Sequence, residues 1–412
     1  MKKVLIIGFT WPEPSTTAAG KRMLQLIKIF KKNKFSITFA STASKTAYSY
    51  DLNSLDIATF TITLNDPSFD DFIVDLNPNI VLFDRFLTEE QFGWRVTKYC
   101  PNAIKILDTE DLHFLRSARS KAYNQKVTTI NSFLYDTTTY REIASIYRCD
   151  LSLIISKYEY KLLTSTFKID KKLLLYIPFL IAPLSENSFT NYPDFYGRSN
   201  FISIGNFKHE PNKNAALVLK TKIWPLIKKE LPKARLNIYG AYVGSSIKQL
   251  HNEKNGFIIN GWASNLEEVF VNSRVCLAPI QFGAGLKGKL IDAMQYGTPN
   301  VTTSVGAEGM QHKLAWSGFI EDDIQLFSER AIKLYKEEKL WIEAQQQGIA
   351  IINKNFSDKK FEKKLIIKIE ELNLNLKQYR NQNFIGRMLE HHTLNSSKYL
   401  AKWIELKNSI KN

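Results

Sequence analysis

The sequence has few cysteines and no long apolar run. Cys100, Cys149 and Cys276 are widely spaced among the 412 residues, so they show neither the paired spacing of a metal site nor a disulfide framework. No apolar stretch approaches the roughly 18 residues that a membrane-spanning helix needs. The apolar run Val4–Ile7 is too short for a signal peptide, and no small-residue cleavage site follows it. We therefore interpret it as a first strand and expect a cytoplasmic protein.

Acidic side chains are the minority among the charged residues. The chain has 56 Lys and Arg residues against 40 Asp and Glu residues, a net charge of +16. The lysines are scattered along predicted helices, as at Lys28, Lys31 and Lys32, which favours ordinary solvated helix faces. Attraction to an anionic membrane surface or an acidic acceptor is the second interpretation. No nucleic-acid-binding motif accompanies the charge, so we expect no nucleic-acid partner.

Short apolar runs alternate with amphipathic stretches along the first half of the chain, without a tandem repeat or low-complexity tract. The predicted strands are Val4–Gly8, Ser36–Ala40, Ala58–Leu64, Ile80–Phe83, Ile104–Leu107 and Leu151–Ser156. A helix is predicted over Ala18–Lys31, because apolar residues recur there at helical spacing. This order of elements is typical of a parallel sheet covered by helices.

A second series of the same kind follows a stretch rich in Pro, Ser and Asn. Its predicted strands are Phe201–Ile204, Arg235–Tyr239, Phe257–Ile259, Val275–Pro279 and Val301–Ser304, with a long helix over Asn212–Lys229. After Asp322 the chain is predicted to be helical. We therefore expect an α/β protein with two Rossmann-like domains that face each other across a ligand-binding cleft. The predicted boundaries are an N-terminal Rossmann-like domain over 1–185, a linker over 186–200, a C-terminal Rossmann-like domain over 201–356, and helices over 357–412 that pack back on the N-terminal domain.

The strongest functional signal is a glycine-rich loop that follows a predicted strand and opens a predicted helix. It reads Gly283-Ala284-Gly285-Leu286-Lys287-Gly288-Lys289, and the helix continues through Asp292 to Tyr296. Backbone N–H groups at a helix N-terminus bind anions, and the two lysines add positive charge. The loop therefore predicts a site for phosphate groups.

Two known nucleotide sites share parts of this pattern, and a tight turn without a ligand is a third possibility. The three glycines fit a dinucleotide fingerprint, with Glu308 about 20 residues beyond, but that fingerprint belongs at the first strand–helix turn of its domain. A nucleotide-hydrolysing P-loop nearly fits, but Leu290 stands where Ser or Thr must reach magnesium. A mere tight turn would explain the glycines but not two lysines and a carboxylate at the same place.

The same region resembles a known family. The stretch 283–289, followed by Asp292-Ala293-Met294, Tyr296-Gly297-Thr298-Pro299 and Gly306-Ala307-Glu308-Gly309, resembles the donor-binding signature of GT-B glycosyltransferases of family 4, the group 1 type. Residues 204–212 and 223–227 resemble the opening of that family's C-terminal domain, residues 107–113 its active-site histidine segment, and Trp11–Arg22 its N-terminal glycine loop. The resemblance covers nearly the whole chain and is most specific over residues 283–309.

The resemblance implies a retaining transferase that uses a nucleoside-diphosphate sugar without a metal or other cofactor. Lys289 is implied to neutralise the diphosphate, Asp292 to bind the ribose, and His113 to face the transferred sugar, and these are the predicted catalytic residues. Further donor contacts are predicted at Gly205, Asn206, His209, Gly283, Ala284, Gly285, Leu286 and Lys287, and acceptor-side positions at Gly20 and Arg22. We expect Glu110 and Asp111 to orient or charge His113, Glu308 to hold its turn, and Trp262 to pack in the core rather than touch the nucleotide base.

One position departs from the family. The family usually has a pair of glutamates, and here the second is Asp292 while the first position holds Ala284, so the sugar is left open. We expect transfer to a glycan or lipid-linked acceptor, in the synthesis of cell-surface polysaccharide or glycoconjugates. The alternatives are a nucleotide-sugar epimerase of the same fold and a non-catalytic scaffold subunit.

The tail over 381–412 is predicted to form an amphipathic helix. We favour docking of this helix onto the body of the protein. The alternative is peripheral attachment to the inner face of an anionic membrane through Trp403 with Lys398, Lys402 and Lys407.

Overall fold

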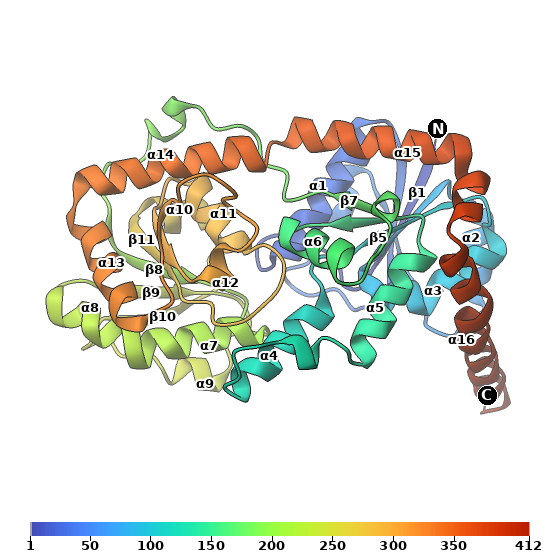
Figure 1. The fold of residues 1–412 in the computed structure, drawn as a ribbon, viewed down its shortest axis with the longest axis horizontal. Coiled ribbons are helices and arrows are strands. Elements are labelled where there is room, and N and C mark those ends of the chain that lie inside the picture. Colours follow the sequence, from blue (N-terminus) through green and yellow to red (C-terminus); the bar gives the residue numbers. More distant parts are fainter. Residues whose placement is uncertain (1, 412) are drawn as a thin grey trace.

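The first half of the chain forms a seven-stranded parallel sheet (Figure 1). The computed structural model describes residues 2–411, apart from the side chains at 186, 393, 394, 397 and 411. The strands are β1 (Lys3–Gly8), β2 (Ser36–Ser41), β3 (Ala58–Thr61), β4 (Ile80–Asp84), β5 (Ile104–Asp108), β6 (Leu151–Ile154) and β7 (Leu174–Tyr176), in the order β3-β2-β1-β4-β5-β6-β7. The central strands are buried on both faces, which is why their sequences are continuously apolar.

Helices cover both faces of this sheet. They are α1 (Ala18–Lys32), α2 (Ser68–Leu76), α3 (Arg85–Tyr99), α4 (His113–Asn124), α5 (Thr137–Arg148) and α6 (Lys157–Ser165), with short 3₁₀ turns at Leu52–Leu55, Asn131–Phe133 and Lys171–Leu173. Helix α1 has the predicted extent because Thr17 caps its first turn, accepting from the Gly20 N–H at 2.9 Å, and lysines lie in its last turn.

The second half forms a six-stranded parallel sheet in the order β10-β9-β8-β11-β12-β13. The strands are β8 (Ser199–Ile204), β9 (Leu236–Tyr239), β10 (Phe257–Gly261), β11 (Ser273–Ala278), β12 (Asn300–Thr302) and β13 (Gly318–Ile320). The helices are α7 (Glu210–Val218), α8 (Trp224–Glu230), α9 (Ser245–Lys248), α10 (Leu266–Val271), α11 (Gly288–Gln295), α12 (Ser304–Ala307), α13 (Ile324–Lys336) and α14 (Glu338–Asn355), with a 3₁₀ turn at Glu186–Phe189 before β8. The predicted α/β fold with two parallel sheets is confirmed.

The predicted helix over Asn212–Lys229 is interrupted. A π-helical turn, Leu219–Ile223, separates α7 from α8, directly before Pro225. Proline has no N–H to donate to the preceding turn, so it is placed at the start of a new helical segment.

In each sheet the direction in which the strands are added reverses at one point. This point lies between β1 and β4 in the first sheet and between β8 and β11 in the second. Ligands of doubly wound sheets bind beyond the carboxyl ends of the strands at such points. The loops that follow β1, β4, β8 and β11 therefore position the functional site.

The chain crosses between the two domains twice at one place. The Ile181 N–H donates to the Phe356 carbonyl at 2.8 Å, and the Asp358 N–H donates to the Ile181 carbonyl at 3.1 Å. Beyond this crossing α15 (Asp358–Gln382) lies along the N-terminal domain beside α1 (Figure 1), where Phe361 and Leu365 enter the core. The final helices thus pack on the N-terminal domain.

The last helix, α16 (Phe384–Lys411), docks through one of its faces. The buried Arg95 of α3 pairs with Asp70 and Glu405, Lys105 pairs with Glu390, and Ala401 is buried against Trp94. The large apolar residues of the other face are exposed: Tyr399, Leu400, Trp403, Leu406 and Ile410. Position 412 of the predicted tail lies outside the described residues. No helix in the described part of the chain combines the length and apolar character needed to cross a membrane.

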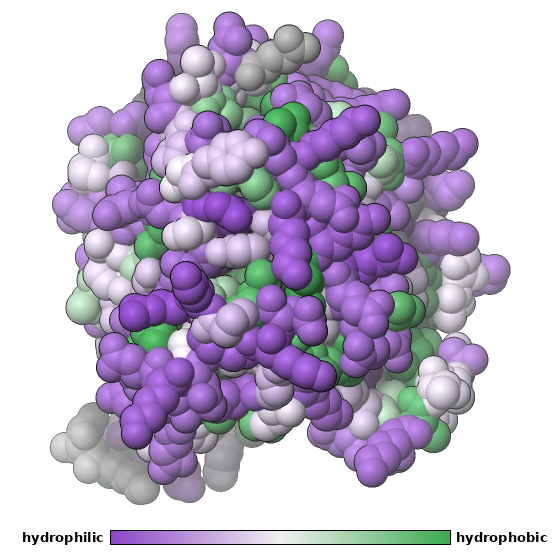
Figure 2. Space-filling model, turned by 90° about the vertical axis from the view of Figure 1, so that its left-hand side faces the viewer, coloured by the Kyte–Doolittle hydropathy of each residue, from purple (hydrophilic) through white to green (hydrophobic). Residues whose placement is uncertain are grey.

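The outer end of the C-terminal domain shows how the charged residues are distributed. Figure 2 shows this end covered mostly by hydrophilic side chains, with only small and separate apolar spots. This agrees with the interpretation of the scattered lysines as solvated helix faces.

Candidate active site

A cavity of about 500 Å³ lies between the two domains. Its N-terminal wall is formed by the loops after β1, β4 and β5, and its C-terminal wall by the loops after β8, β9, β10 and β11. This volume is within the range that small-molecule sites usually have. Of the predicted site residues, His113, Gly205, Asn206, His209, Lys289, Asp292 and the whole loop 283–287 line the cavity.

The glycine-rich loop turns sharply before α11. Gly285 has φ +64°, a left-handed conformation that favours glycine, and a side chain there would also meet Asp111 of the other domain. The loop directs the N-terminus of α11 at the cavity, where its N–H groups and the helix dipole attract anions. The predicted phosphate cradle therefore has the geometry that such a site needs.

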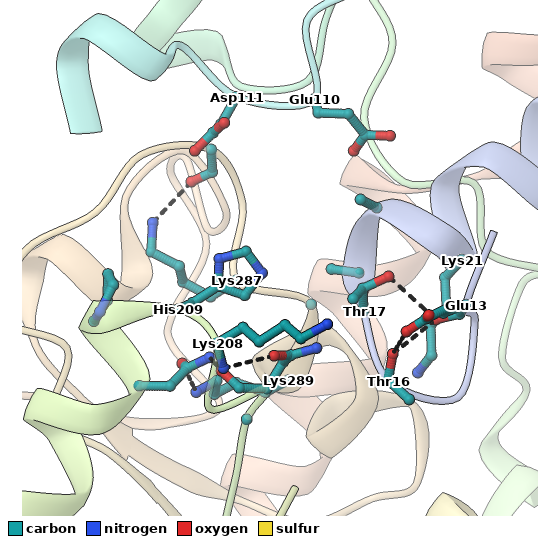
Figure 3. A pocket seen from close by; sticks show the side chains of 18 of the residues that line it. Glu13, Thr16, Thr17, Lys21, Glu110, Asp111, Lys208, His209, Lys287 and Lys289 are labelled. Atoms are coloured by element: carbon teal, nitrogen blue, oxygen red, sulfur yellow. Dashed lines mark hydrogen bonds between the residues drawn. The ribbon is translucent and has the colours of Figure 1, made fainter. Parts of the chain in front are cut away.

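Two lysines of this loop reach into the cavity (Figure 3). Lys287 Nζ donates to the carbonyls of Ala284 at 3.1 Å and Gly285 at 2.9 Å, and Lys289 Nζ donates to Asn212 Oδ1 at 2.7 Å. Burial lowers the pKa of each lysine to about 8. A bound anion favours the charged form of both lysines, so each remains a strong partner for phosphate.

A third lysine on this wall was missed by sequence reasoning. Lys208 follows the predicted Asn206 and lines the cavity, with its Nζ 3.6 Å from the centre of the Tyr242 ring. Asn206 and His209, on either side of Lys208 in the sequence, were predicted donor contacts. The positive charge of Lys208 beside them was the signal that could have identified it.

Asp292 is joined to the opposite wall. Its Oδ1 lies 2.6 Å from Lys21 Nζ of α1, and both side chains line the cavity. Lys21 was not predicted, although the residues on either side of it were. The pair links the helix that follows the glycine-rich loop to the first helix of the other domain.

Gly20 and Arg22 do not line the cavity, which corrects their predicted acceptor-side position. Arg22 is buried, pairing with Asp108 at 2.7 Å and donating to the Ile177 carbonyl at 2.7 Å. A Cβ on Gly20 would lie 2.5 Å from the backbone of Glu13, so this glycine lets the loop before α1 pack closely. Consecutive helix positions point in different directions, which puts Lys21 in the cavity and Arg22 in the core.

His113 begins α4 at the carboxyl end of β5. Its Nε2 lies 3.5 Å from Asp111 Oδ1, and burial lowers its pKa to about 4. The imidazole is therefore neutral at pH 7, so Asp111 contacts it without charging it, and the structure gives no contact between Glu110 and the imidazole among the described residues. His209 lines the cavity from the opposite domain.

Two side chains of the N-terminal domain hold the glycine-rich loop. Arg119 of α4 donates to both Glu308 oxygens at 2.8 and 2.7 Å and to the Gly283 carbonyl at 2.8 Å. Glu159 Oε1 accepts from the Gly285 N–H at 2.8 Å and from the Leu112 N–H at 3.1 Å. Burial raises the pKa of Glu159 to about 7. Glu308 thus holds an interdomain contact through Arg119.

Aromatic residues line or border the cavity on the C-terminal side. Trp262 is 41% exposed and lines it, so the expected core packing of Trp262 is wrong. Its ring centre lies 5.1 Å from that of Tyr48, and Tyr242 donates its hydroxyl to Glu13 at 2.9 Å. Such rings offer a flat surface on which a heterocycle can stack.

Within residues 2–411 no group of three or more His, Cys, Asp or Glu side chains has the arrangement of a metal site.

Comparisons with known proteins agree with this architecture. Residues 198–337 match the model of the family Glycosyl transferases group 1. A segment of 168 residues is 26% identical to an uncharacterized 44.6 kDa protein in the cps region of Klebsiella pneumoniae, and the match spans 39% of this chain and 43% of that protein.

Solved structures resemble nearly the whole chain. A mutant of S. aureus TarM in complex with Fondaparinux, alpha-GlcNAc-glycerol and UDP is 10% identical with a TM-score of 0.68, covering 90% of this chain and 100% of that one. Anabaena HepE in complex with UDP and glucose is 11% identical with a TM-score of 0.68, and the same shares of the chains are covered. The pneumococcal O-GlcNAc transferase GtfA in complex with UDP and GlcNAc is 13% identical with a TM-score of 0.66, covering 90% and 99%. The predicted GT-B fold is confirmed.

Proposed function

We propose that this chain, a glycosyltransferase of GT-B fold whose C-terminal domain matches glycosyl transferases group 1, moves a sugar from a nucleoside-diphosphate sugar to a glycan or lipid-linked acceptor. The observation that carries the proposal is the glycine-rich loop at the N-terminus of α11, with Lys287 and Lys289 in the interdomain cavity. The reaction belongs to the synthesis of cell-surface polysaccharide or glycoconjugates, which the relative from a cps region supports.

The diphosphate of the donor lies at this loop. Loop N–H groups and Lys289 meet the charge that grows on the leaving diphosphate as the bond to the sugar breaks. Lys208 and Lys287 add positive charge on the same wall. These groups supply the charge stabilisation that a metal ion gives in other transferases, and we propose that no metal or cofactor takes part.

Asp292 accepts hydrogen bonds from the ribose hydroxyls. The Lys21–Asp292 pair at 2.6 Å holds this carboxylate at the cavity, between the two domains. When the ribose binds, its hydroxyls share Asp292 with Lys21, or Lys21 turns to the diphosphate. The base stacks near Trp262 and Tyr242.

The transferred sugar faces the neutral His113, whose imidazole both donates and accepts hydrogen bonds. Retention of the anomeric configuration is proposed from the family resemblance. The UDP bound to TarM, HepE and GtfA favours a uridine donor for the first trial.

We place the protein in the cytoplasm and at the inner face of the membrane, where a lipid-linked acceptor is found. The exposed apolar residues Tyr399, Trp403 and Leu406 of α16 enter the interface, and Lys398 and Lys407 meet anionic headgroups.

A thermal-shift screen of nucleoside diphosphates and their sugars tests the donor half of the proposal without an acceptor. We expect one base to raise the unfolding temperature, and donor turnover to vanish in Lys289→Ala. Absence of any nucleotide affinity would favour a scaffold subunit, and a free isomerised sugar as product would favour an epimerase. The anomeric configuration of the product, read by NMR, tests retention.

A further inference from the structure

Glu110 is a buried carboxyl group that follows β5 and lines the cavity. It is 9% exposed, and its Oε1 has no hydrogen-bond partner among the residues that the structure describes. Buried polar atoms in folded proteins almost always have partners. A buried carboxyl group that lacks one and faces a cavity therefore points to a ligand.

The backbone holds Glu110 in a conformation that a residue with a side chain seldom adopts. Its φ is +61°, and the turn is closed by the Asp111 N–H, which donates to the Thr109 carbonyl at 2.7 Å. Strain of this kind persists where surrounding structure fixes a functional group. The same turn touches the glycine-rich loop, because a Cβ built on Gly285 would lie 3.4 Å from the Glu110 carbonyl oxygen.

The neighbouring cations are already engaged. Arg22 pairs with Asp108 at 2.7 Å, and Arg85 lies 3.7 Å from Asp84. Burial first, and then the charges of Asp108 and Asp84, raise the pKa of Glu110 well above its usual range, while Arg22 and Arg85 act in the opposite sense. A carboxyl group that keeps its proton offers both a donor and an acceptor.

Asp111, the next residue, also lines the cavity, but its carboxyl group has partners within the protein. It lies 2.5 Å from Arg116 and 3.5 Å from His113, and the charge of Arg116 is the main cause that lowers its pKa against burial. Figure 3 shows the two carboxyl groups turned to opposite sides of the turn. Asp111 is therefore satisfied within the protein, and Glu110 is not.

The surroundings favour an uncharged polar ligand for Glu110. Asp84 and Asp108 lie nearby and repel an anion, while a hydroxyl group can donate to and accept from the same carboxyl group. On the facing loop, Ala284 presents only a methyl group to the cavity. A sugar between the two walls thus finds the hydrogen-bonding side chain on the N-terminal wall.

We propose that Glu110 is a specificity-determining residue that binds a hydroxyl group of a sugar in the cavity, either the transferred sugar or the acceptor. This inference rests on the proposed function and names one of the contacts by which the site reads its sugar. The variants that test it are Glu110→Gln, which keeps the shape and hydrogen-bonding groups, and Glu110→Ala, which removes them. Glu253→Gln, at an exposed glutamate far from the cavity, is the matched control.

Folding is measured first, by thermal unfolding at pH 8. Because a buried carboxyl group without a partner does not stabilise the fold, Glu110→Gln is expected to unfold at or above the wild-type temperature. A residue retained only for structure would give a lower unfolding temperature in both variants with substrate specificity unchanged, and this result would overturn the proposal.

Kinetics with an active donor then separate the two sources of the hydroxyl. If the donor supplies it, Glu110→Ala lowers kcat/KM for donor hydrolysis by about 30-fold and narrows the preference over deoxy and epimeric sugars. If the acceptor supplies it, hydrolysis is unchanged and kcat/KM for the acceptor falls by about as much. In either case kcat/KM decreases less in Glu110→Gln than in Glu110→Ala. The affinity for the free nucleoside diphosphate stays at the wild-type value in both variants.

Values within about twofold of wild type for both substrates in Glu110→Ala would overturn the inference. That outcome leaves the proposed function standing, because it requires a wild-type enzyme that transfers sugar. A wild-type protein without nucleotide affinity would instead contradict the proposed function itself.

Discussion

The two walls of the cavity differ in how their chemistry is arranged. The C-terminal wall draws its charged groups from two short segments, 205–212 and 283–292, and three of them are lysines. The N-terminal wall combines side chains from the loops after several strands, with charges of both signs, and it includes the buried carboxyl group Glu110, whose pKa is raised. One wall thus concentrates positive charge at an anion site, and the other presents hydrogen-bonding groups from several loops, which suits hydroxyls.

This difference indicates which wall suits the nucleotide and which wall suits the sugar. A diphosphate needs concentrated positive charge and a helix N-terminus, which one contiguous loop can supply. A sugar needs several hydroxyl contacts from different directions, which a single loop cannot supply. The predictions below test whether the two walls carry these separate tasks.

The largest effect is expected at the C-terminal wall. Lys289→Ala should lower kcat/KM by about 10³-fold, because the growing charge on the leaving diphosphate loses its closest cation. Steady-state kinetics and calorimetry with the nucleoside diphosphate measure the loss, with the exposed Lys254→Ala as the control. Full activity together with unchanged affinity in Lys289→Ala would place the diphosphate elsewhere.

The sequence predicted this wall well because its groups are contiguous. A strand, a glycine turn with Lys287 and a helix with Lys289 follow one another between residues 273 and 295, and each leaves a local signal. Strands β7 and β13 were missed because each has only three residues and lies at a sheet edge. A run that short carries no periodicity to recognise.

The contacts between the two domains could not be predicted in the same way. Arg119 and Glu159 reach the glycine-rich loop from α4 and α6, more than 100 positions away in sequence. Their positions follow from how the two domains meet, and no local pattern encodes that. The acceptor-side prediction named Gly20 and Arg22, whereas Lys21 between them lines the cavity. The sequence indicated a helix there but not which of its faces lies at the cavity.

The second effect concerns the contact between the walls. The pKa of Glu159 in the folded protein is about 7, above the usual 4.5. The favourable contribution of this group to the free energy of unfolding is therefore complete below pH 4.5 and is lost as pH rises through 7. The loss in free energy of unfolding attributable to this group is about 3 kcal/mol. Thermal unfolding of the wild type and of Glu159→Gln between pH 5 and 8 should show a smaller pH dependence in the variant.

The exposed Glu253→Gln should keep the wild-type pH dependence. Parallel pH curves for the wild type and Glu159→Gln would mean that Glu159 stays ionised when buried. The contact between α6 and the Gly285 N–H would then be an ordinary charged hydrogen bond.

A third, smaller effect is expected at Asp292, where the two walls share a carboxylate. Asp292→Asn keeps the shape but loses the charge that accepts from ribose hydroxyls, so KM for the donor should rise by about 30-fold. The loss should be equal for donors that differ only in their sugar, which separates this position from Glu110. A loss that depends on the sugar would contradict this separation between Asp292 and Glu110. The exposed Asp75→Asn serves as the control.

The smallest effect is expected at α16, which packs on the N-terminal domain. Binding of α16 to a membrane would bring the N-terminal wall of the cavity to a lipid-linked acceptor. Truncation is unsuited as a test, because it would leave the buried Arg95 and Lys105 without Glu405 and Glu390. The double substitution Trp403→Ala with Leu406→Ala removes only exposed apolar groups, 58% and 61% exposed.

Binding to vesicles of phosphatidylcholine with phosphatidylglycerol, measured by sedimentation, should fall by about tenfold in this double variant. Activity on a water-soluble acceptor should stay at the wild-type level, because α16 lies outside the cavity. The matched control, Leu326→Ala with Ile342→Ala, removes comparably exposed side chains from the C-terminal domain. Wild-type binding to the vesicles in the α16 variant, or equal losses in both double variants, would mean that α16 does not direct the N-terminal wall to the membrane. The positive charge of the chain would then attract lipids without orienting the cavity.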